Sequence, residues 1–162
     1  MEYYFYLKLI HILSSTVLFG TGLGSAFYMW RADRSGDVSI IAMVAKNVVF
    51  ADWLFTTLTI IIQPLTGVLM IYLSGYPFSA HWLLVSQVLY IFIGLCWIPV
   101  VFIQLKVAAL AEQALLGSRL LMTEWSYRHR RLMNWWYGLG VLAFIATIAV
   151  FYFMVFKPFT LF

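Results

Sequence analysis

Charged residues are scarce in this chain of 162 residues. Only 10% of the residues are Asp, Glu, Lys or Arg, whereas 64% are apolar or aromatic. A soluble domain is typically about 45–50% apolar, and one small core cannot hide so large an apolar excess. The mean hydropathy of +0.95 agrees with this conclusion. The composition therefore excludes a soluble globular protein and predicts that lipid surrounds most of the chain.

Cysteine is limited to Cys96, which excludes an intramolecular disulfide and a zinc site made of cysteines. Catalytic motifs are also missing, because the sequence has no nucleophile triad, P-loop, HExxH or paired carboxylates, and its apolar runs contain no acidic residue except Asp52. These absences argue against hydrolysis and against a carboxylate-based proton pump. The basic residues are not arranged on a soluble recognition fold, so we expect no nucleic acid binding.

Four long apolar runs predict an all-α, four-helix transmembrane bundle that forms a single domain. A spanning helix needs about 20 mostly apolar residues. The predicted spans are residues 3–30, 48–74, 80–105 and 132–156. Between the last two spans, from Lys106 to Glu124, apolar residues recur at helical spacing with charged residues on the other side. This pattern predicts a short amphipathic surface helix in the loop between helices 3 and 4.

Basic residues are unevenly divided between the two ends of such a bundle. The end with the 31–47 and 106–131 loops would carry eight basic residues, whereas the end with both termini and the 75–79 turn would carry only Lys8 and Lys157. Because positively charged loops stay in the cytoplasm, we expect both loops to be cytoplasmic and both termini to be outside. We expect the membrane to be the bacterial cytoplasmic (inner) membrane.

Two ionisable residues, Lys8 and His11, interrupt the first apolar run. Such residues are costly in lipid and are candidate functional residues. Their spacing puts both on one helix face, and at about 1.5 Å per residue His11 lies roughly 10–12 Å from the start of the span. An imidazole at this depth can ligate a haem iron, with Lys8 placed to pair with a propionate. In the structural alternative, Lys8 reaches the interface and His11 hydrogen-bonds a neighbouring helix.

Residues near the outer ends of the other spans are candidates for the opposite side of a haem. Met70 and Met154 lie at a depth similar to that of His11, and either sulfur would complete a His/Met site, although most methionines in an apolar chain serve packing. Gly67 is at the same level, where a missing side chain would admit a porphyrin edge. His81 is a further candidate, although its place at the start of the third span favours an interfacial role.

Gln63 and Pro64 place a polar and a helix-distorting residue in the middle of the second span. Proline lacks the N–H that would bond the carbonyl four residues back, at Ile60, so we expect a kink and a carbonyl that needs another partner. Gln63 would either join a neighbouring helix, which is the commoner role, or point at a quinone or tetrapyrrole. Gly20 and Gly24 form a small-xxx-small pair, which predicts either a close helix contact or a homodimer seam.

Three short motifs resemble those of the HemJ-type membrane protoporphyrinogen oxidases: Tyr6-x-Lys8-x-x-His11, Phe19-Gly20 and the closing Lys157-Pro158-Phe159. The resemblance covers the first span and the last few residues. It implies a four-helix fold, with His11 as a ligand of b-type haem and Lys8 as a functional neighbour. The chain departs from that pattern at Ser86, where those enzymes carry a lysine, and at Trp135-Trp136, where they carry a Glu and a Pro.

Over its full length the chain is similar to a bacterial family of predicted integral membrane proteins of unknown function within the broad HemJ/CopD-like group. The segments that carry this similarity are residues 63–67, residues 89–94 with Trp97, Pro99 and Gln104, and residues 127–151. The similarity implies the fold and no activity.

The residues and the resemblance together give two main expectations. The first is a protein that binds one b-type haem, or a related tetrapyrrole, through His11 and has a redox role, either electron transfer with a quinone or oxidation of a porphyrinogen. The second is a non-catalytic membrane scaffold or small transporter subunit without a cofactor, whose Arg-rich loop recruits partners or anionic lipid. Copper import is a weaker expectation, because Met and His are not clustered in one motif.

Overall fold

The computed structural model describes residues 2–117 and 119–158. Its helical content is 93%, and the described part of the chain has no strand. The elements are α1 (Glu2–Ser35), α2 (Val38–Ala51), the π-helix η1 (Asp52–Thr56), α3 (Thr57–Ser74), α4 (His81–Leu116) and α5 (Arg119–Phe156). Within this part of the chain, four helical segments are long and apolar enough to cross a membrane, with α2, η1 and α3 together forming one of them. The predicted four-helix transmembrane bundle is therefore confirmed.

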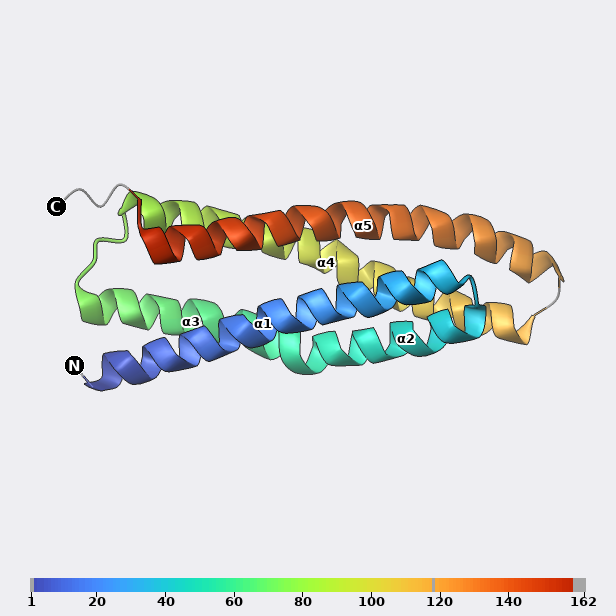
Figure 1. Ribbon diagram of the computed structural model, residues 1–162, viewed down its shortest axis with the longest axis horizontal. Helices are drawn as coiled ribbons and strands as arrows, with labels where there is room; N and C mark the ends of the chain where they lie inside the picture. Colours follow the sequence, from blue (N-terminus) through green and yellow to red (C-terminus); the bar gives the residue numbers. More distant parts are fainter. Residues whose placement is uncertain (1, 118, 159–162) are drawn as a thin grey trace.

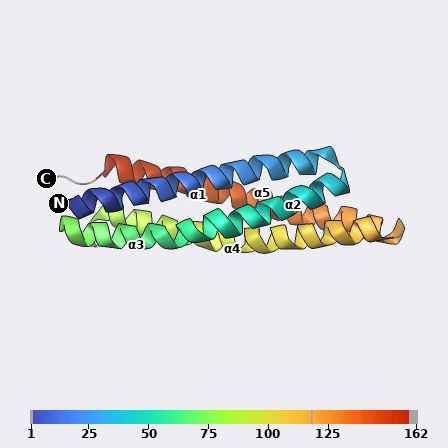
Figure 2. The ribbon, with the colours of Figure 1, turned by 90° about the horizontal axis from the view of Figure 1, so that it is seen from below.

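The two ends of the bundle carry different connections (Figure 1). Both termini and the α3–α4 connection lie at one end, which we call the terminal end. The α1–α2 and α4–α5 connections lie at the other end, which we call the loop end. Figure 2 shows that α2 and α3 continue one another along the bundle. This rod packs against α1 and, through α2, against α4, while α5 packs mainly on α4 and approaches the backbone of α1 at few points.

The predicted 31–47 loop is wrong, because most of these residues are helical. Only Gly36 and Asp37 separate α1 from α2. Gly36 takes a left-handed φ of 68°, which glycine adopts without a steric penalty. Asp37 caps α2, and its carboxylate accepts hydrogen bonds from the Ser39 hydroxyl and from the backbone N–H groups of Ser39 and Ile40. These bonds lower the pKa of the Asp37 carboxyl, so the cap is lost as the pH falls through the lowered value.

The separate amphipathic surface helix predicted between helices 3 and 4 is also wrong. Helix α4 continues to Leu116 and α5 begins at Arg119, so the predicted 106–131 loop shrinks to a short connection; Ser118 lies outside the described residues. The apolar face of this part of α4 is buried in the core of the bundle, and its most buried members are Val107, Ala108, Ala111 and Ala114. The periodicity was real, but its apolar face packs on helices of the same chain rather than on lipid.

The buried apolar residues concentrate at the loop end. One cluster joins side chains from α1, α2, α4 and α5, including Met29, Ile41, Val107, Trp125 and Met133. At about 1.5 Å per residue, the 36 residues of α4 span roughly 54 Å, well beyond a hydrocarbon core of about 30 Å. Helix ends outside the lipid need hydrophobic burial to stay together, whereas inside lipid polar contacts and close packing take over. The length of α4 therefore indicates that its last turns at the loop end extend beyond the hydrocarbon core.

Pro64 lies inside α3, as the sequence predicts. The carbonyl that its missing N–H leaves unpaired accepts a hydrogen bond from another helix. The hydroxyl of Tyr90, on α4, donates a hydrogen bond to the carbonyl oxygen of Ile60 at 2.5 Å. This confirms that the Ile60 carbonyl finds a partner outside its own helix. The bond also ties α3 to α4 at the depth of the proline.

Tyr90→Phe is expected to destabilise the bundle, because it leaves the Ile60 carbonyl without a partner. The expected loss is about 1–2 kcal/mol, since hydrogen bonds inside membranes contribute modestly but an unpaired buried carbonyl carries a penalty. Unfolding of the detergent-solubilised protein by a denaturing detergent measures the change. Tyr72→Phe is the matched control, because Tyr72 is 80% exposed on α3. Equal stability of the two variants would contradict the role of Tyr90.

Candidate functional site

His11 is hydrogen-bonded across the contact between α1 and α3. Its Nδ1 lies 2.8 Å from Oγ1 of Thr66. The Thr66 hydroxyl has a single proton, which it donates to the carbonyl oxygen of Ile62 at 2.7 Å in its own helix. With that proton donated to the Ile62 carbonyl, Thr66 accepts the bond from His11, and the matching neutral tautomer carries its proton on Nδ1. In this tautomer the Nε2 atom carries the lone pair.

Gly67 provides the space beside this imidazole. A Cβ atom built on Gly67 would lie 3.6 Å from Cε1 of His11, which is ordinary van der Waals contact. Any longer side chain at this position would extend into the region of the ring edge between Nδ1 and Nε2. The ring of His11 therefore lies against α3 next to Gly67, as the shared depth of the two residues predicts.

Gln63 joins α3 to α1 directly. Its Nε2 atom donates to the carbonyl oxygen of His11 at 2.8 Å and to Oγ of Ser14 at 2.6 Å. The Ser14 hydroxyl in turn donates to the His11 carbonyl at 3.1 Å. Both amide protons of Gln63 are therefore donated to groups of α1. This corresponds to the first expected role of Gln63, which was to join a neighbouring helix. The His11 backbone is fixed by Gln63 and Ser14, while its side chain is fixed by Thr66.

These contacts belong to a longer stripe of buried polar residues on η1 and α3. The stripe consists of Asp52, Thr56, Thr59, Gln63 and Thr66, all at most 9% exposed and spaced by four and three residues. This spacing puts them on one helix face. Thr59 and Thr66 donate to carbonyls of their own helix, so their hydroxyls are satisfied without help from α1 or α4. The stripe provides interhelical contacts within the lipid-embedded part of the chain.

Asp52 begins this stripe, and it was not among the residues predicted for the site. Its carboxylate accepts a hydrogen bond from Thr56 at 3.0 Å and has the amide of Gln104, on α4, within hydrogen-bonding reach. Gln104 is 2% exposed, and its Oε1 has no partner among the described residues. Because α2 begins at Val38, Asp52 lies roughly 21 Å along the rod and not near its end. The sequence signal for this contact was the spacing of Asp52 and Thr56, which are four residues apart and so share one helix face.

The other predicted site residues stand on separate turns at the terminal end. Met70 follows Thr66 by four residues on the same face of α3, and it is half-buried. Phe151 of α5 contacts Phe19 of α1, with ring centroids 5.5 Å apart, so Met154 lies one turn beyond that contact. His81 is the exposed first residue of α4. The structure thus brings His11, Gln63 and Gly67 together, while Met70, Met154 and His81 lie at the same end without joining that group.

Lys8 and Lys157, the two lysines of the resembled motifs, occupy the terminal end. Lys8 is exposed one turn outward from His11 and makes no ion pair with a described residue. The ammonium of Lys157 lies 5.1 Å from the ring centroids of both Tyr76 and Trp82, which attaches the end of α5 to the α3–α4 connection. Phe159 of the closing motif lies outside the described residues.

The glycine pair of α1 makes no close helix contact inside the chain. A Cβ built on Gly20 or Gly24 would meet no atom within 4 Å. The first of the two expected roles, close packing within the bundle, is therefore wrong for the described residues. The homodimer seam stays a prediction.

Comparison with known proteins identifies the family of the chain. The model of a family described as predicted integral membrane proteins, DUF2269, matches residues 5–158. This range runs from the first turns of α1 to the end of α5 and includes the whole His11 site. Neither a search of curated proteins nor a search of solved structures found a match. The chain therefore belongs to the DUF2269 family of predicted integral membrane proteins.

Proposed function

We propose that this protein binds one b-type haem, or a related tetrapyrrole, at the terminal end of the bundle, with His11 as an axial ligand. The observation that carries the proposal is the hydrogen bond from Nδ1 of His11 to Thr66. Histidines that bind metals typically donate their second ring N–H to an oxygen, which fixes the tautomer and directs the other nitrogen to the metal. His11 has this arrangement, and Nε2 is the nitrogen it leaves for a ligand.

A porphyrin suits this site better than a bare metal ion. Within the described residues, no group of three or more His, Cys, Asp or Glu side chains gathers to hold a metal. A metal at His11 would therefore take most of its ligands from a non-protein group, as iron does from the four nitrogens of a porphyrin. Gly67 supports the same choice, because it keeps the neighbourhood of the imidazole free of a side chain.

The residues at the terminal end have distinct proposed roles. Thr66 holds the imidazole and raises the basicity of Nε2, while Gln63 and Ser14 fix the backbone of His11. Lys8, one turn outward and exposed, would pair with a propionate. Met70, Met154 and His81 would be the candidates for a second ligand, since all three lie at the same end of the bundle as His11.

The proposed role is a redox one. Haem supplies a one-electron couple when bound. The chain would set its potential by burial and ligation, and the partner would be a quinone, or a porphyrinogen that the protein oxidises. We also propose the bacterial inner membrane as the location, with both termini outside, because the loop end carries eight of the ten basic residues.

A scaffold or small transporter subunit without a cofactor is the second candidate. The observation that favours it is the network of Gln63, Ser14 and the His11 carbonyl, which joins α1 to α3 through protein groups alone. This function requires the polar groups only for packing. It therefore predicts a stable and colourless protein.

Visible spectra of the protein purified from haem-supplied cells separate the two candidates. Haem binding predicts a Soret band in the oxidised protein and sharpened visible bands after reduction with dithionite. The haem content, measured as the pyridine haemochrome, should approach one per chain. A colourless protein that stays folded would overturn the haem proposal and favour the scaffold.

A further inference from the structure

A pocket at the loop end lies between the last turn of α1 and the middle of α5. Its volume is about 370 Å³, and most of its lining is polar or charged. The lining residues that matter here are Asp33, Arg34, Arg130, Asn134 and Tyr137. This pocket is at the opposite end of the bundle from His11, so its function is separate from the haem proposal.

The acidic residue of the pocket is already paired within the protein. The hydroxyl of Tyr137 donates to Oδ2 of Asp33 at 2.7 Å, and Nε2 of His129 lies 3.4 Å from Oδ1 of the same carboxylate. The ring of Trp125 stacks on His129 with centroids 4.4 Å apart, which holds the imidazole in place. The carboxylate of Asp33 therefore contacts two side chains of α5 and links α1 to α5.

The two guanidinium groups of the pocket have no such partner. Arg34 and Arg130 are exposed, and neither makes an ion pair with a described residue. They come from different helices and line one pocket together with the amide of Asn134. Paired guanidinium groups bind phosphate by parallel hydrogen bonds, so the charge of this pocket suits a phosphate monoanion.

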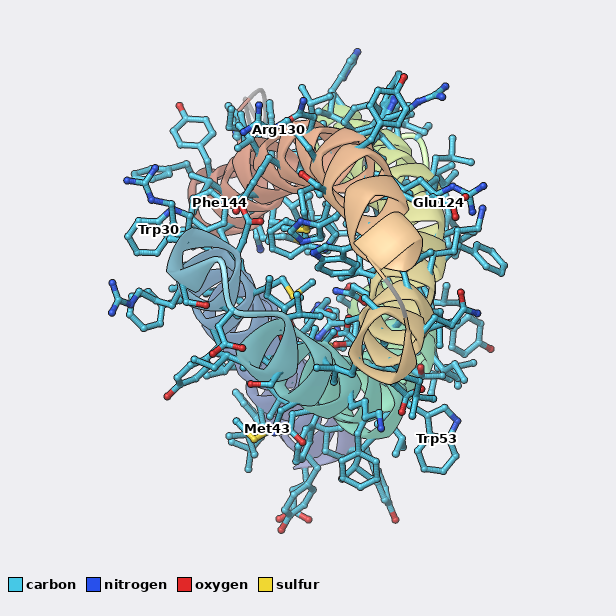
Figure 3. All side chains as sticks on the ribbon, turned by 90° about the vertical axis from the view of Figure 1, so that its right-hand side faces the viewer. Trp30, Met43, Trp53, Glu124, Arg130 and Phe144 are labelled. Atoms are coloured by element: carbon cyan, nitrogen blue, oxygen red, sulfur yellow. The ribbon has the colours of Figure 1, made fainter. Side chains whose placement is uncertain are left out.

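The depth of the pocket places it at the lipid headgroups. Trp30, 44% exposed, lies one turn before Arg34 on α1, and Trp135, 63% exposed, lies between the lining residues of α5. Exposed tryptophans mark the interface between hydrocarbon and headgroups. Figure 3 looks onto the loop end, with Trp30 and Arg130 labelled on the two helices that flank the pocket.

The seam between α1 and α5 continues from this pocket into the membrane. The backbones of the two helices approach each other at few points, and ring contacts of Phe19 with Phe144 and Phe151 bridge them. Apolar side chains along this seam provide a surface for acyl chains. Basic pockets between transmembrane helices on the cytoplasmic side are known binding sites for anionic lipid headgroups.

We propose that the pocket formed by Arg34, Arg130 and Asn134 binds the phosphate of one anionic phospholipid, whose acyl chains lie along the α1–α5 seam. The two arginines hold the headgroup. The hydroxyl of Tyr137 holds the Asp33 carboxylate toward α5, and the pocket keeps a net charge of about +1 from its two arginines and one carboxylate. The bound lipid covers the side of the bundle where the backbones of α1 and α5 approach each other at few points.

Lipid binding is measured by native mass spectrometry of the detergent-solubilised full chain with added phosphatidylglycerol or phosphatidylcholine. The wild type should retain one phosphatidylglycerol in preference to phosphatidylcholine. The double variant Arg34→Gln/Arg130→Gln should bind phosphatidylglycerol roughly 10- to 30-fold more weakly. Arg31→Gln/Arg131→Gln is the matched control, because it removes the same charge from exposed positions that do not line the pocket, and it should change the affinity by less than about threefold.

A measurement on the unaltered chain protects the test against misfolding of the variants. Phosphatidylglycerol with a photoactivatable headgroup should label the segments 30–37 and 130–137. Labelling elsewhere, equal loss in both double variants, or no preference for phosphatidylglycerol would overturn the proposal. So would binding of inorganic phosphate alone with the same dependence on Arg34 and Arg130, because the ligand would then be a free anion.

Discussion

His11→Ala is expected to remove the Soret band from the purified protein. The substitution deletes Nε2, the axial ligand in our proposal, and Thr66 cannot replace it because its hydroxyl donates to the Ile62 carbonyl. The backbone of residue 11 should stay in place, since Gln63 and Ser14 bond its carbonyl oxygen and alanine favours helix. The variant should therefore be folded and colourless, which absorbance at equal protein concentration and thermal unfolding together measure.

His129→Gln is the matched control for this experiment. His129 lies at the loop end beside Asp33, far along the bundle from His11, so its removal should leave the haem content unchanged. A Soret band of wild-type intensity in His11→Ala would contradict the assignment of the ligand. Loss of the band in both variants would contradict a specific role for His11.

Thr66→Val is expected to weaken haem binding by about 10- to 100-fold, the usual effect of removing a hydrogen-bond partner of a metal-bound histidine. Valine has nearly the shape of threonine but cannot accept the bond from Nδ1 of His11. The imidazole would lose its fixed tautomer and orientation, so the potential and the visible spectrum should also shift. Titration of the haem-free protein with haemin measures the affinity.

Two further variants make the Thr66 experiment specific. Thr66→Ser restores a hydroxyl at the same place and should recover most of the affinity. Thr59→Val removes a hydroxyl that bonds only carbonyls of its own helix, on the same buried stripe, and should leave the affinity unchanged. If Thr66→Val and Thr59→Val bind haemin equally well, the hydrogen bond to Nδ1 has no part in ligation.

The sequence predicted the spans because long apolar runs and the spacing of Lys8 and His11 are local properties. It also predicted the unpaired Ile60 carbonyl, since the effect of Pro64 on its own helix is fixed by covalent structure. It did not predict that residues 38–47 are helical, or that residues 106–116 continue the third spanning helix instead of forming a separate surface helix. Their apolar faces are buried by helices distant in sequence, and a single periodic pattern does not tell a protein core from a lipid surface.

Local sequence patterns also could not predict which residues the site residues would contact. The contact of His11 with Thr66 joins positions 55 residues apart, and that of Asp33 with Tyr137 joins positions 104 apart. Depth arithmetic brought Gly67 to the level of His11 because the two residues lie on antiparallel helices of one bundle. It could not select Thr66 over its neighbours, since that choice depends on the rotation of α3 about its own axis.

The central claim, that His11 is the haem ligand, has a direct spectroscopic test. The chain has three histidines, so the double variant His81→Gln/His129→Gln leaves His11 alone. This variant is labelled with ¹⁵N-histidine, loaded with haem, and examined in the oxidised state by electron–nuclear double resonance. The account predicts a strong hyperfine coupling to one histidine nitrogen. Bound haem without that coupling, or a folded wild-type chain that takes up no haem, would contradict it.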